Sequence, residues 1–265
     1  MYNLLMEKSI KMKHYFKYKY KDKIEFYLDN NEFVSIVGNS NDFFVDTLLN
    51  YNKELTVRSG SNTFKNDNKG QIYKEVAIVL NKNLNIFSAE TVMDEIAFPL
   101  EGLAYTKDDM IESIVSYSRL FKLDHLLERD PYSLGSSDKA KLKILSYLII
   151  KPKVLVLDNI LSELDYNDKL LIIKILNEYK NNGGIIINVT NDIEESLFSD
   201  RIIILYDNSL ACDGKTLSVL NEEKLLKRLG IGLPFIVELN KYFMDYGLIN
   251  KYYLKNEKLV GALWK

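Results

Sequence analysis

Two carboxylates that could take part in metal or phosphate chemistry follow a short apolar run in the segment KPKVLVLDNILSELD, residues 151–165. The run Val154–Leu157 is short and continuous, which is typical of a strand buried on both faces of a parallel sheet. It ends on Asp158, and Asp165 follows seven residues later. The C-terminal end of such a strand is where open α/β sheets bind ligands. In nucleotide hydrolases an Asp in this place helps to hold Mg²⁺, so Asp158 is a candidate magnesium ligand.

The same segment resembles the ATP-binding-cassette (ABC) family, whose pattern is a strand, then Asp-Glu, then a Ser-x-Leu-Asp loop called the D-loop. Asp158 matches the first Asp, and Ser162, Leu164 and Asp165 match the loop. Asn159 replaces the catalytic Glu of the family. The resemblance implies an α/β fold: a P-loop NTPase-like ABC ATPase domain with a mixed sheet core, an antiparallel β subdomain and a helical subdomain. It also implies ATP and Mg²⁺ as cofactors, with Asp158 on the metal.

The segment in the place of the family's phosphate loop is strongly altered. Such a loop needs glycines that let backbone amides crowd around phosphates, a lysine, and a Ser or Thr hydroxyl for Mg²⁺. The lysine and hydroxyl positions are Phe44 and Val45, and a shift by one residue brings Thr47 onto a Thr without restoring a lysine. Losing that lysine removes a charge-assisted bond worth about 1.5–3 kcal/mol, so we expect nucleotide binding weaker than micromolar, or none. The loop positions are Gly38, Asn39, Ser40, Asn41, Asp42, Phe43, Phe44, Val45 and Asp46.

A second altered motif is the family's signature loop, Leu-Ser-Gly-Gly-Gln, which begins a helix and faces the nucleotide of the partner subunit. Here the sequence is Leu134, Gly135, Ser136, Ser137 and Asp138, at a suitable distance before Asp158. Two hydroxyls near a helix start could still donate to a phosphate, whereas Asp138 would repel one. The alternative is an ordinary Ser or Asp N-cap without nucleotide contact.

Other family positions carry substitutions as well. Asn81 stands where the family has the Gln that lies near the magnesium ion and the attacking water. Asn191 stands where it has a switch His. The two histidines, His14 and His125, lie elsewhere in the sequence. We therefore expect no catalytic residue at positions 81, 159 and 191, since each such loss typically costs about 10²–10⁴-fold in rate. Tyr20 occupies the place of the aromatic that stacks on adenine, although a role in the core is the alternative.

Two further stretches resemble the energy-coupling factor (ECF) type of importer within this family. Ser88–Gly102 resembles the helix after the Gln loop, and Leu225–Phe243 with Glu257–Lys265 resembles the C-terminal extension of the ATPase subunits. The resemblance implies two partners, a sister ABC ATPase in a heterodimer and a transmembrane scaffold, at the cytoplasmic face of the cell membrane. Asp94 and Glu95 are the residues expected to contact the scaffold. The alternative for them is a solvated acidic helix face.

The elements that would position these motifs alternate between strands and helices, which favours a parallel sheet with right-handed crossovers. We expect a domain at 1–215, with a helical subdomain at about 88–150, and a helical extension at 216–265. The segment 59–70 is polar and predicts a loop, and Thr47–Tyr51 predicts a helix. Strands are expected at Phe16–Tyr20, Lys23–Leu28, Phe33–Val37, Val76–Leu80, Val154–Asp158, Ile185–Thr190 and Arg201–Asp207.

Composition narrows the class of protein. A chain of 265 residues with 47% hydrophobic and 27% charged residues can form a large core, so disorder is not expected. The net charge of −2 gives no support to a nucleic-acid partner. The single cysteine excludes an intramolecular disulfide and suits a reducing compartment. Charges interrupt the apolar stretches well before the ~18–20 residues of a membrane span, and the N-terminus lacks the apolar core of a secretory signal.

The sequence leaves three functions open. The first is a catalytically degenerate ATPase subunit that completes a heterodimer with an active sister and couples to the membrane scaffold. The second is a working ATPase that uses shifted groups such as Asp46 or Glu163. The third is a regulatory protein outside transport, built on the same fold. The combined loss of the family's Lys, Glu, Gln and His favours the first.

Overall fold

The computed structural model describes residues 15–50, 54–64, 72–73, 75–101, 103 and 105–264. Every candidate site residue falls within these ranges. Among the residues and segments named above, His14, Tyr51, residues 65–70, Gly102 and Lys265 lie outside them.

A six-stranded mixed sheet forms the centre of the molecule, in the order β10-β9-β3-β8-β7-β6. Five strands are parallel, and β10 pairs antiparallel with β9 at one edge. Side chains alternate between the two faces, and in β7 Val154 and Val156 point to one core while Leu155 and Leu157 point to the other. The strands are β3 (Phe33–Val37), β6 (Val76–Leu80), β7 (Val154–Asp158), β8 (Ile185–Val189), β9 (Arg201–Tyr206) and β10 (Ser209–Lys215).

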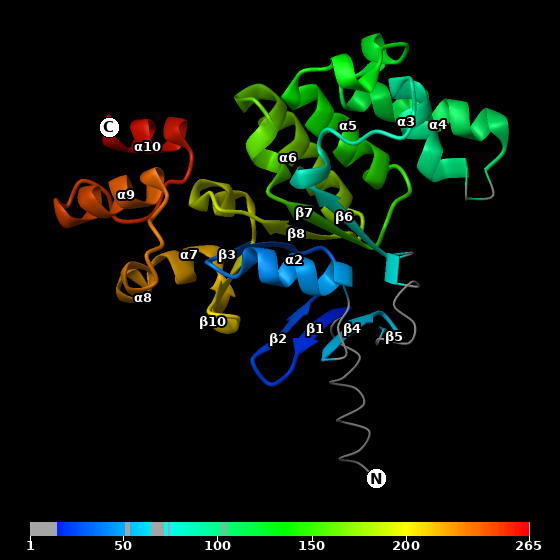
Figure 1. Ribbon diagram of the computed structural model, residues 1–265. Coiled ribbons are helices and arrows are strands. Elements are labelled where there is room, and N and C mark those ends of the chain that lie inside the picture. The colour runs from blue at the N-terminus through cyan, green and yellow to red at the C-terminus, as the bar shows by residue number, and fades with distance from the viewer. Residues whose placement is uncertain are drawn as a thin grey trace, which may run out of the picture.

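A second, antiparallel sheet lies below the first in Figure 1, in the order β2-β1-β4-β5. Its strands are β1 (Phe16–Tyr20), β2 (Ile24–Leu28), β4 (Leu55–Ser59) and β5 (Asn62–Phe64). The expected loop at 59–70 is wrong in part, because β4 ends at Ser59 and β5 follows within this segment. The short β4 alternates between buried and half-buried residues and pairs with β1, some forty residues earlier in the chain, so its partner is not visible locally.

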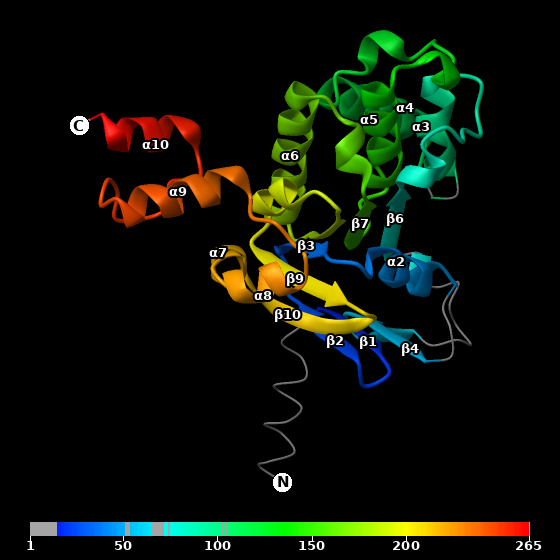
Figure 2. The same ribbon diagram turned by 60° about the vertical axis from the view of Figure 1, so that its left-hand side comes forward.

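One helix, α2 (Asn41–Asn50), runs between the two sheets (Figure 2). Phe44, Val45 and Leu48 fix it there, since they are buried in the core that both sheets share. The expected helix start at Thr47 is wrong, because helical hydrogen bonding already includes Phe44 N donating to Ser40 O at 3.1 Å. The additional turn covers the positions that a phosphate loop would need.

Helices cover the other face of the six-stranded sheet, above it in Figure 1. They are α3 (Val92–Glu101), α4 (Lys107–Leu120), α5 (Ser136–Leu148) and α6 (Tyr166–Asn181). The expected helical content of this region is confirmed, and α5 packs beside α3 and α6. Short 3₁₀ turns connect the elements: η2 (Asn81–Asn83), η3 (Asp124–Leu126), η4 (Pro131–Ser133), η5 (Ile160–Glu163) and η6 (Ile193–Phe198).

The C-terminal part forms α7 (Thr216–Leu220), α8 (Glu223–Arg228), α9 (Phe235–Asp245) and α10 (Asn256–Leu263). In Figure 2 α9 and α10 extend to one side of the sheets. Their buried residues join Val37, Ile202 and Ile204 of the central sheet in one apolar cluster.

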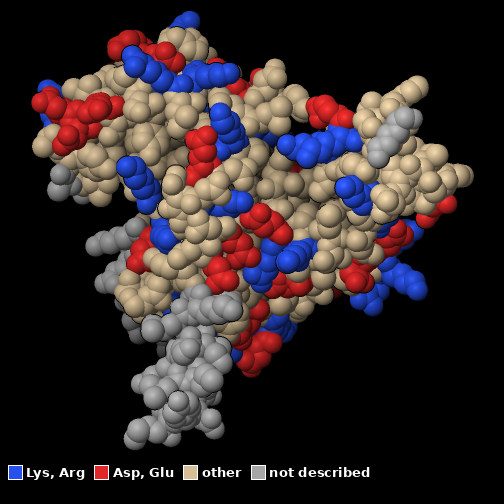
Figure 3. Space-filling model, turned by 180° about the vertical axis from the view of Figure 1, so that it is seen from behind, with Lys and Arg blue, Asp and Glu red and all other residues tan. Residues whose placement is uncertain are grey.

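No helix in the described ranges combines the length and the apolar character that crossing a bilayer requires. On the face shown in Figure 3, Lys and Arg side chains of the described residues lie among Asp and Glu rather than in one basic area.

Candidate nucleotide site

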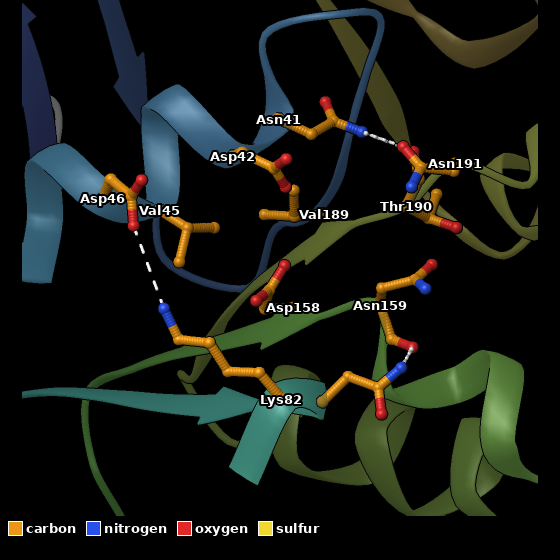
Figure 4. Close-up of a pocket in the computed structure, with 11 residues that line it drawn as sticks. Asn41, Asp42, Val45, Asp46, Lys82, Asp158, Asn159, Val189, Thr190 and Asn191 are labelled. Atoms are coloured by element: carbon orange, nitrogen blue, oxygen red, sulfur yellow. Dashed lines mark hydrogen bonds and ion pairs between the residues drawn. The ribbon is translucent and has the colours of Figure 1, made fainter. Parts of the chain in front are cut away.

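A polar cavity of about 570 Å³ opens at the C-terminal ends of the parallel strands β6, β7 and β8, opposite the first turns of α2 (Figure 4). This is the edge at which the sequence placed a ligand site. Eight of the residues singled out from the sequence meet in its wall, joined by Lys82, Val189 and Thr190. The eight are Asn41, Asp42, Val45, Asp46, Asn81, Asp158, Asn159 and Asn191.

The helical geometry of α2 decides which of its side chains reach the cavity. Asn41, Asp42, Val45 and Asp46 line it, whereas Phe44 is fully buried between the sheets. The Phe44 ring lies 4.9 Å from that of Tyr18, centroid to centroid. The position that corresponds to the family's lysine therefore points into the apolar core and away from the cavity.

The alternative register, which relied on Thr47, provides no hydroxyl for the cavity. Thr47 Oγ1 lies 2.6 Å from Tyr18 Oη and donates to Phe44 O at 2.8 Å. Both contacts lie in the interior, on the side of α2 that faces β1. Thr47 thus fixes the helix in the core.

The turn before α2 is tied to the other side of the sheet. Gly38 has φ +123°, and a Cβ atom there would lie 2.1 Å from Leu205 O, so only glycine fits. Asn39 exchanges two hydrogen bonds with Asp207, donating from Nδ2 and accepting from the Asp207 amide, both at 2.9 Å. Ser40 Oγ accepts from the Asn208 amide at 2.9 Å. Polar side chains of this turn are thereby engaged away from the cavity.

The charged groups of the cavity wall are three carboxylates and one lysine. Asp42 and Asp46 come from α2, and Asp158 comes from the end of β7. Burial raises the pKa of Asp158 above its ordinary value, and the negative charge of Asp42 adds to the effect while Lys82 opposes it. The wall is therefore net negative, which disfavours the approach of a polyanion.

Lys82 is a site residue that the sequence reasoning missed. It follows Asn81 at the end of β6, and its Nζ reaches across the cavity to Asp46 Oδ1 at 3.9 Å (Figure 4). The segment that forms α2, where the family's lysine would stand, contains no Lys or Arg. The place of Lys82 directly after a buried strand was the available signal.

Two small hydrogen-bond networks hold the asparagines of the wall. Asn41 Nδ2 donates to Thr190 O at 2.8 Å and to Asn191 Oδ1 at 3.0 Å. Asn81 Nδ2 donates to Asn159 O at 3.3 Å and to Glu163 Oε1 at 3.1 Å. The side-chain amides of Asn41 and Asn191 thus bind each other, whereas Asn81 binds the Asn159 backbone and the Glu163 carboxylate. None of these amide groups can accept a proton from an attacking water, as a carboxylate could.

The aromatic residue Tyr20 is not among the residues that line the cavity, and its ring is covered. Only 8% of its surface is exposed, its hydroxyl donates to Glu54 at 3.1 Å, and Phe43 packs against its ring edge-to-face at 4.9 Å. Lys21 Nζ lies 5.6 Å from the same ring. Tyr20 is therefore part of the core, as the alternative expected, and its stacking on adenine stays a prediction.

The signature and D-loop residues are held together away from the cavity. Gly135 caps α5 without a side-chain bond, so the expectation of a Ser or Asp N-cap is wrong. Ser137 Oγ donates to Asp168 at 2.6 Å and accepts from the Asp165 amide at 3.3 Å. Lys141 forms an ion pair with Asp138 at 2.8 Å, and Ser136 remains exposed at the helix start.

In the D-loop, Ser162 Oγ donates to Asn159 O, and Leu164 is buried.

The two acidic residues assigned to scaffold contact differ in position. Asp94 is exposed in the first turn of α3, where it accepts from Thr91 Oγ1 at 2.6 Å. Glu95 is 7% exposed and accepts from the Ser88 amide at 2.8 Å and from Lys143 at 3.0 Å. Asp94 alone is on the surface.

The side chains of the wall fit a magnesium-bound triphosphate poorly. Among the described residues no three His, Cys, Asp or Glu side chains are grouped so that they could hold a metal ion. The wall offers one lysine, already opposite a carboxylate, and its negative charge opposes phosphate.

The fold of this chain is that of the ABC ATPase subunits. The structure of cbiO1 from Clostridium perfringens, part of the ABC transporter complex cbiONQ, aligns with a TM-score of 0.69 and 18% identity over 86% of this chain and 99% of that one. The expected fold class is thereby confirmed. No protein-family model matches the chain.

Sequence relatives give the particular family. The ECF transporter ATP-binding protein EcfA1 of Halalkalibacterium halodurans is 30% identical over 208 residues, which is 78% of this chain and 75% of that protein. EcfA1 of Listeria innocua is 25% identical and covers 98% of both chains. The chain belongs to the family of energy-coupling factor transporter ATP-binding proteins. ATP and Mg²⁺ are the cofactors that this family implies.

Proposed function

We propose that this chain is the catalytically degenerate half of an ECF-type ATPase pair. It joins an active sister subunit, which hydrolyses ATP, and it transmits motion to a transmembrane scaffold at the cytoplasmic face of the membrane. In this proposal residues 1–215 form the ATPase-like domain, with its helical subdomain at about 88–150, and residues 216–265 form the extension.

The observation that carries the proposal is the amide Asn159 at the end of β7, next to Asp158. Its backbone amide donates to Val189 O at 2.8 Å, and its φ of +50° places it in a tight left-handed turn. A carboxamide at this point cannot act as general base for water, and the carboxylates of the wall, Asp42, Asp46 and Asp158, stand at other positions than the family's base. Asp158 is retained, but the catalytic Glu that follows it in the family is replaced by Asn159.

The alternative of a working ATPase with shifted groups has less support. Asp46 lies opposite Lys82, and Glu163 accepts a hydrogen bond from Asn81. Both carboxylates are thus engaged with neighbours in the wall. The alternative of a regulatory protein outside transport is weakened by membership in a family of transporter subunits.

The surface that supports coupling to the scaffold lies on α3. Asp94 is exposed there, and Phe98, one helical turn later, is 60% exposed although it is apolar. A carboxylate beside an uncovered aromatic ring suits a partner helix with a basic and an apolar side chain. Glu95 is left out of this proposed contact because it is engaged in the interior with Lys143.

The proposal is tested by steady-state ATP hydrolysis of the purified full chain with Mg²⁺. We expect no turnover above that of a matched Asp158→Ala variant, because no group is placed to activate water. Clear turnover that Asp158→Ala abolishes would overturn the degenerate assignment and support the working-ATPase alternative.

Coupling is tested by expressing the tagged chain with the membrane scaffold and the intact sister ATPase of the same organism. We expect the three proteins to purify together from detergent extracts. Asp94→Lys should reduce recovery of the scaffold, while the exposed Glu238→Lys on α9 serves as a charge-matched control. Equal recovery with both variants would contradict the α3 contact.

A further inference from the structure

Two side chains of α2 lie at positions that correspond to the family's phosphate loop, Asp42 in the cavity wall and Phe43 against Tyr20. We propose that Phe43 and Asp42 exclude nucleotide by occupying, from within, the places of the base and of a phosphate. The missing lysine then weakens further a site that Asp42 and Phe43 already make unfavourable for a nucleotide. This inference rests on the proposed degenerate function and adds a cause to it.

Phe43 is the group that replaces a base. A nucleotide base gains about 1–3 kcal/mol by stacking on an exposed aromatic ring. Tyr20 cannot offer such a ring, because Phe43 contacts it at 4.9 Å with an interplanar angle of 86°, and its surface is 8% exposed. The hydroxyl bond to Glu54 keeps the tyrosine in this position. A base could reach Tyr20 only after Phe43 had moved.

Asp42 is the group that replaces a phosphate. It lies in the first turn of α2, a helix of ten residues, and its carboxylate is in the cavity wall. A negative charge at a helix N-terminus is stabilised by the helix dipole, for the same reason that such a terminus binds phosphate. The chain thus carries its own anion there. The negative charge of Asp42 also contributes to the raised pKa of Asp158, on the other side of the cavity.

The geometry of α2 makes this exclusion independent of the lysine. The family's lysine position is Phe44, which is fully buried, so a lysine there would enter the core. A cation could be placed in the cavity only from the positions of α2 that line it. Such a cation would still meet the carboxylate of Asp42 and leave Tyr20 covered.

The test measures binding of Mg²⁺-ATP to the full chain by equilibrium dialysis, for the wild type, Asp42→Asn, Phe43→Ala and the double variant. We expect each single variant to bind about tenfold more tightly than the wild type, and the double variant about a hundredfold. Unchanged affinity in the double variant, with a native circular dichroism spectrum, would overturn the inference. Should Phe43→Ala fail to fold, Asp42→Asn alone decides the part that concerns the phosphate.

Two matched variants show whether position matters. Asp46→Asn removes the same charge from the same helix, but a turn further from its start, so we expect a smaller gain than for Asp42→Asn. Equal gains would refute the special role of the helix start. Phe235→Ala removes an exposed phenyl ring from α9 and should leave affinity unchanged. ATP turnover by the wild type would instead refute the proposed function, so the two failures are distinguishable.

Discussion

Lys143 of α5 and Glu95 of α3 form an ion pair in the interior, with 3.0 Å between Nζ and Oε1. Lys143 also donates to Ile86 O, and Glu95 Oε2 accepts from the amides of Ser88 and Ala89. The pair therefore holds the segment between the cavity and α3 in place. The ion pair thus links α5 directly to the start of α3.

Breaking this pair should destabilise the protein strongly. Lys143→Met leaves the buried Glu95 carboxylate without its cation, which typically costs about 3–5 kcal/mol in the free energy of unfolding. The double variant Lys143→Met with Glu95→Gln should recover much of the loss, because no unpaired charge remains. Urea denaturation of the three proteins measures both effects. A loss below 1 kcal/mol in the single variant would show that the pair behaves like a surface contact.

Gly38→Ala should also be costly. The added Cβ would lie 2.1 Å from the carbonyl oxygen of Leu205 in β9, and alanine disfavours a φ of +123°. We expect a loss of about 2–3 kcal/mol or more in stability. Thermal unfolding gives the comparison, and Gly232→Ala is the control because nothing lies within 4 Å of its added Cβ. Equal melting temperatures for the two variants would contradict the close approach.

Phe44→Lys, the substitution that would restore the family's lysine, should damage the fold without creating a site. Phe44 is fully buried and packs against Tyr18 and Phe26. Removing a buried phenyl ring costs about 3–5 kcal/mol, and burying an ammonium adds to this. We expect a lower unfolding midpoint and no gain in Mg²⁺-ATP affinity. A stable variant with improved binding would show that α2 can turn this residue toward the cavity.

Asp158 should give a pH-dependent stability difference. Its pKa is raised in the folded chain, chiefly by burial, so the ionised form is destabilising in the fold. The penalty is present at neutral pH and fades as the pH falls through the folded pKa toward the ordinary value. Asp158→Asn should therefore be more stable than the wild type at pH 7.5, and the difference should shrink toward pH 4. A difference that grows on acidification would contradict this sign.

Much of the fold followed from local patterns. Buried apolar runs such as Val154–Leu157 and Val76–Leu80 predicted the central strands, because strands buried on both faces leave a continuous apolar signal. The strand β4 was missed because its five residues gain their place only by pairing with β1. The edge strand β10 was missed for a related reason, since its alternating residues are mostly exposed or half-buried.

The site was predicted in place but not in detail. The ends of β6, β7 and β8 gave the positions of Asn81, Asp158 and Asn191, because parallel strands end at one edge. What sequence could not give was the rotation of α2, which turns Phe44 inward and Asp42 outward. Likewise, nothing in the spacing showed that Glu95 points to Lys143 while its neighbour Asp94 stays on the surface.

The two faces of β9 pack against different parts of the molecule. Ile203 and Leu205 belong to the core between the two sheets, and Ile202 and Ile204 pack against the C-terminal helices. Those helices therefore provide most of the buried residues that cover this face of the strand, beside partly buried residues of η6 and β10. A chain that ends at Lys215 would expose the apolar side chains of this face to water and should aggregate. Loss of the C-terminal helices would therefore require different residues on the face of β9 that they cover.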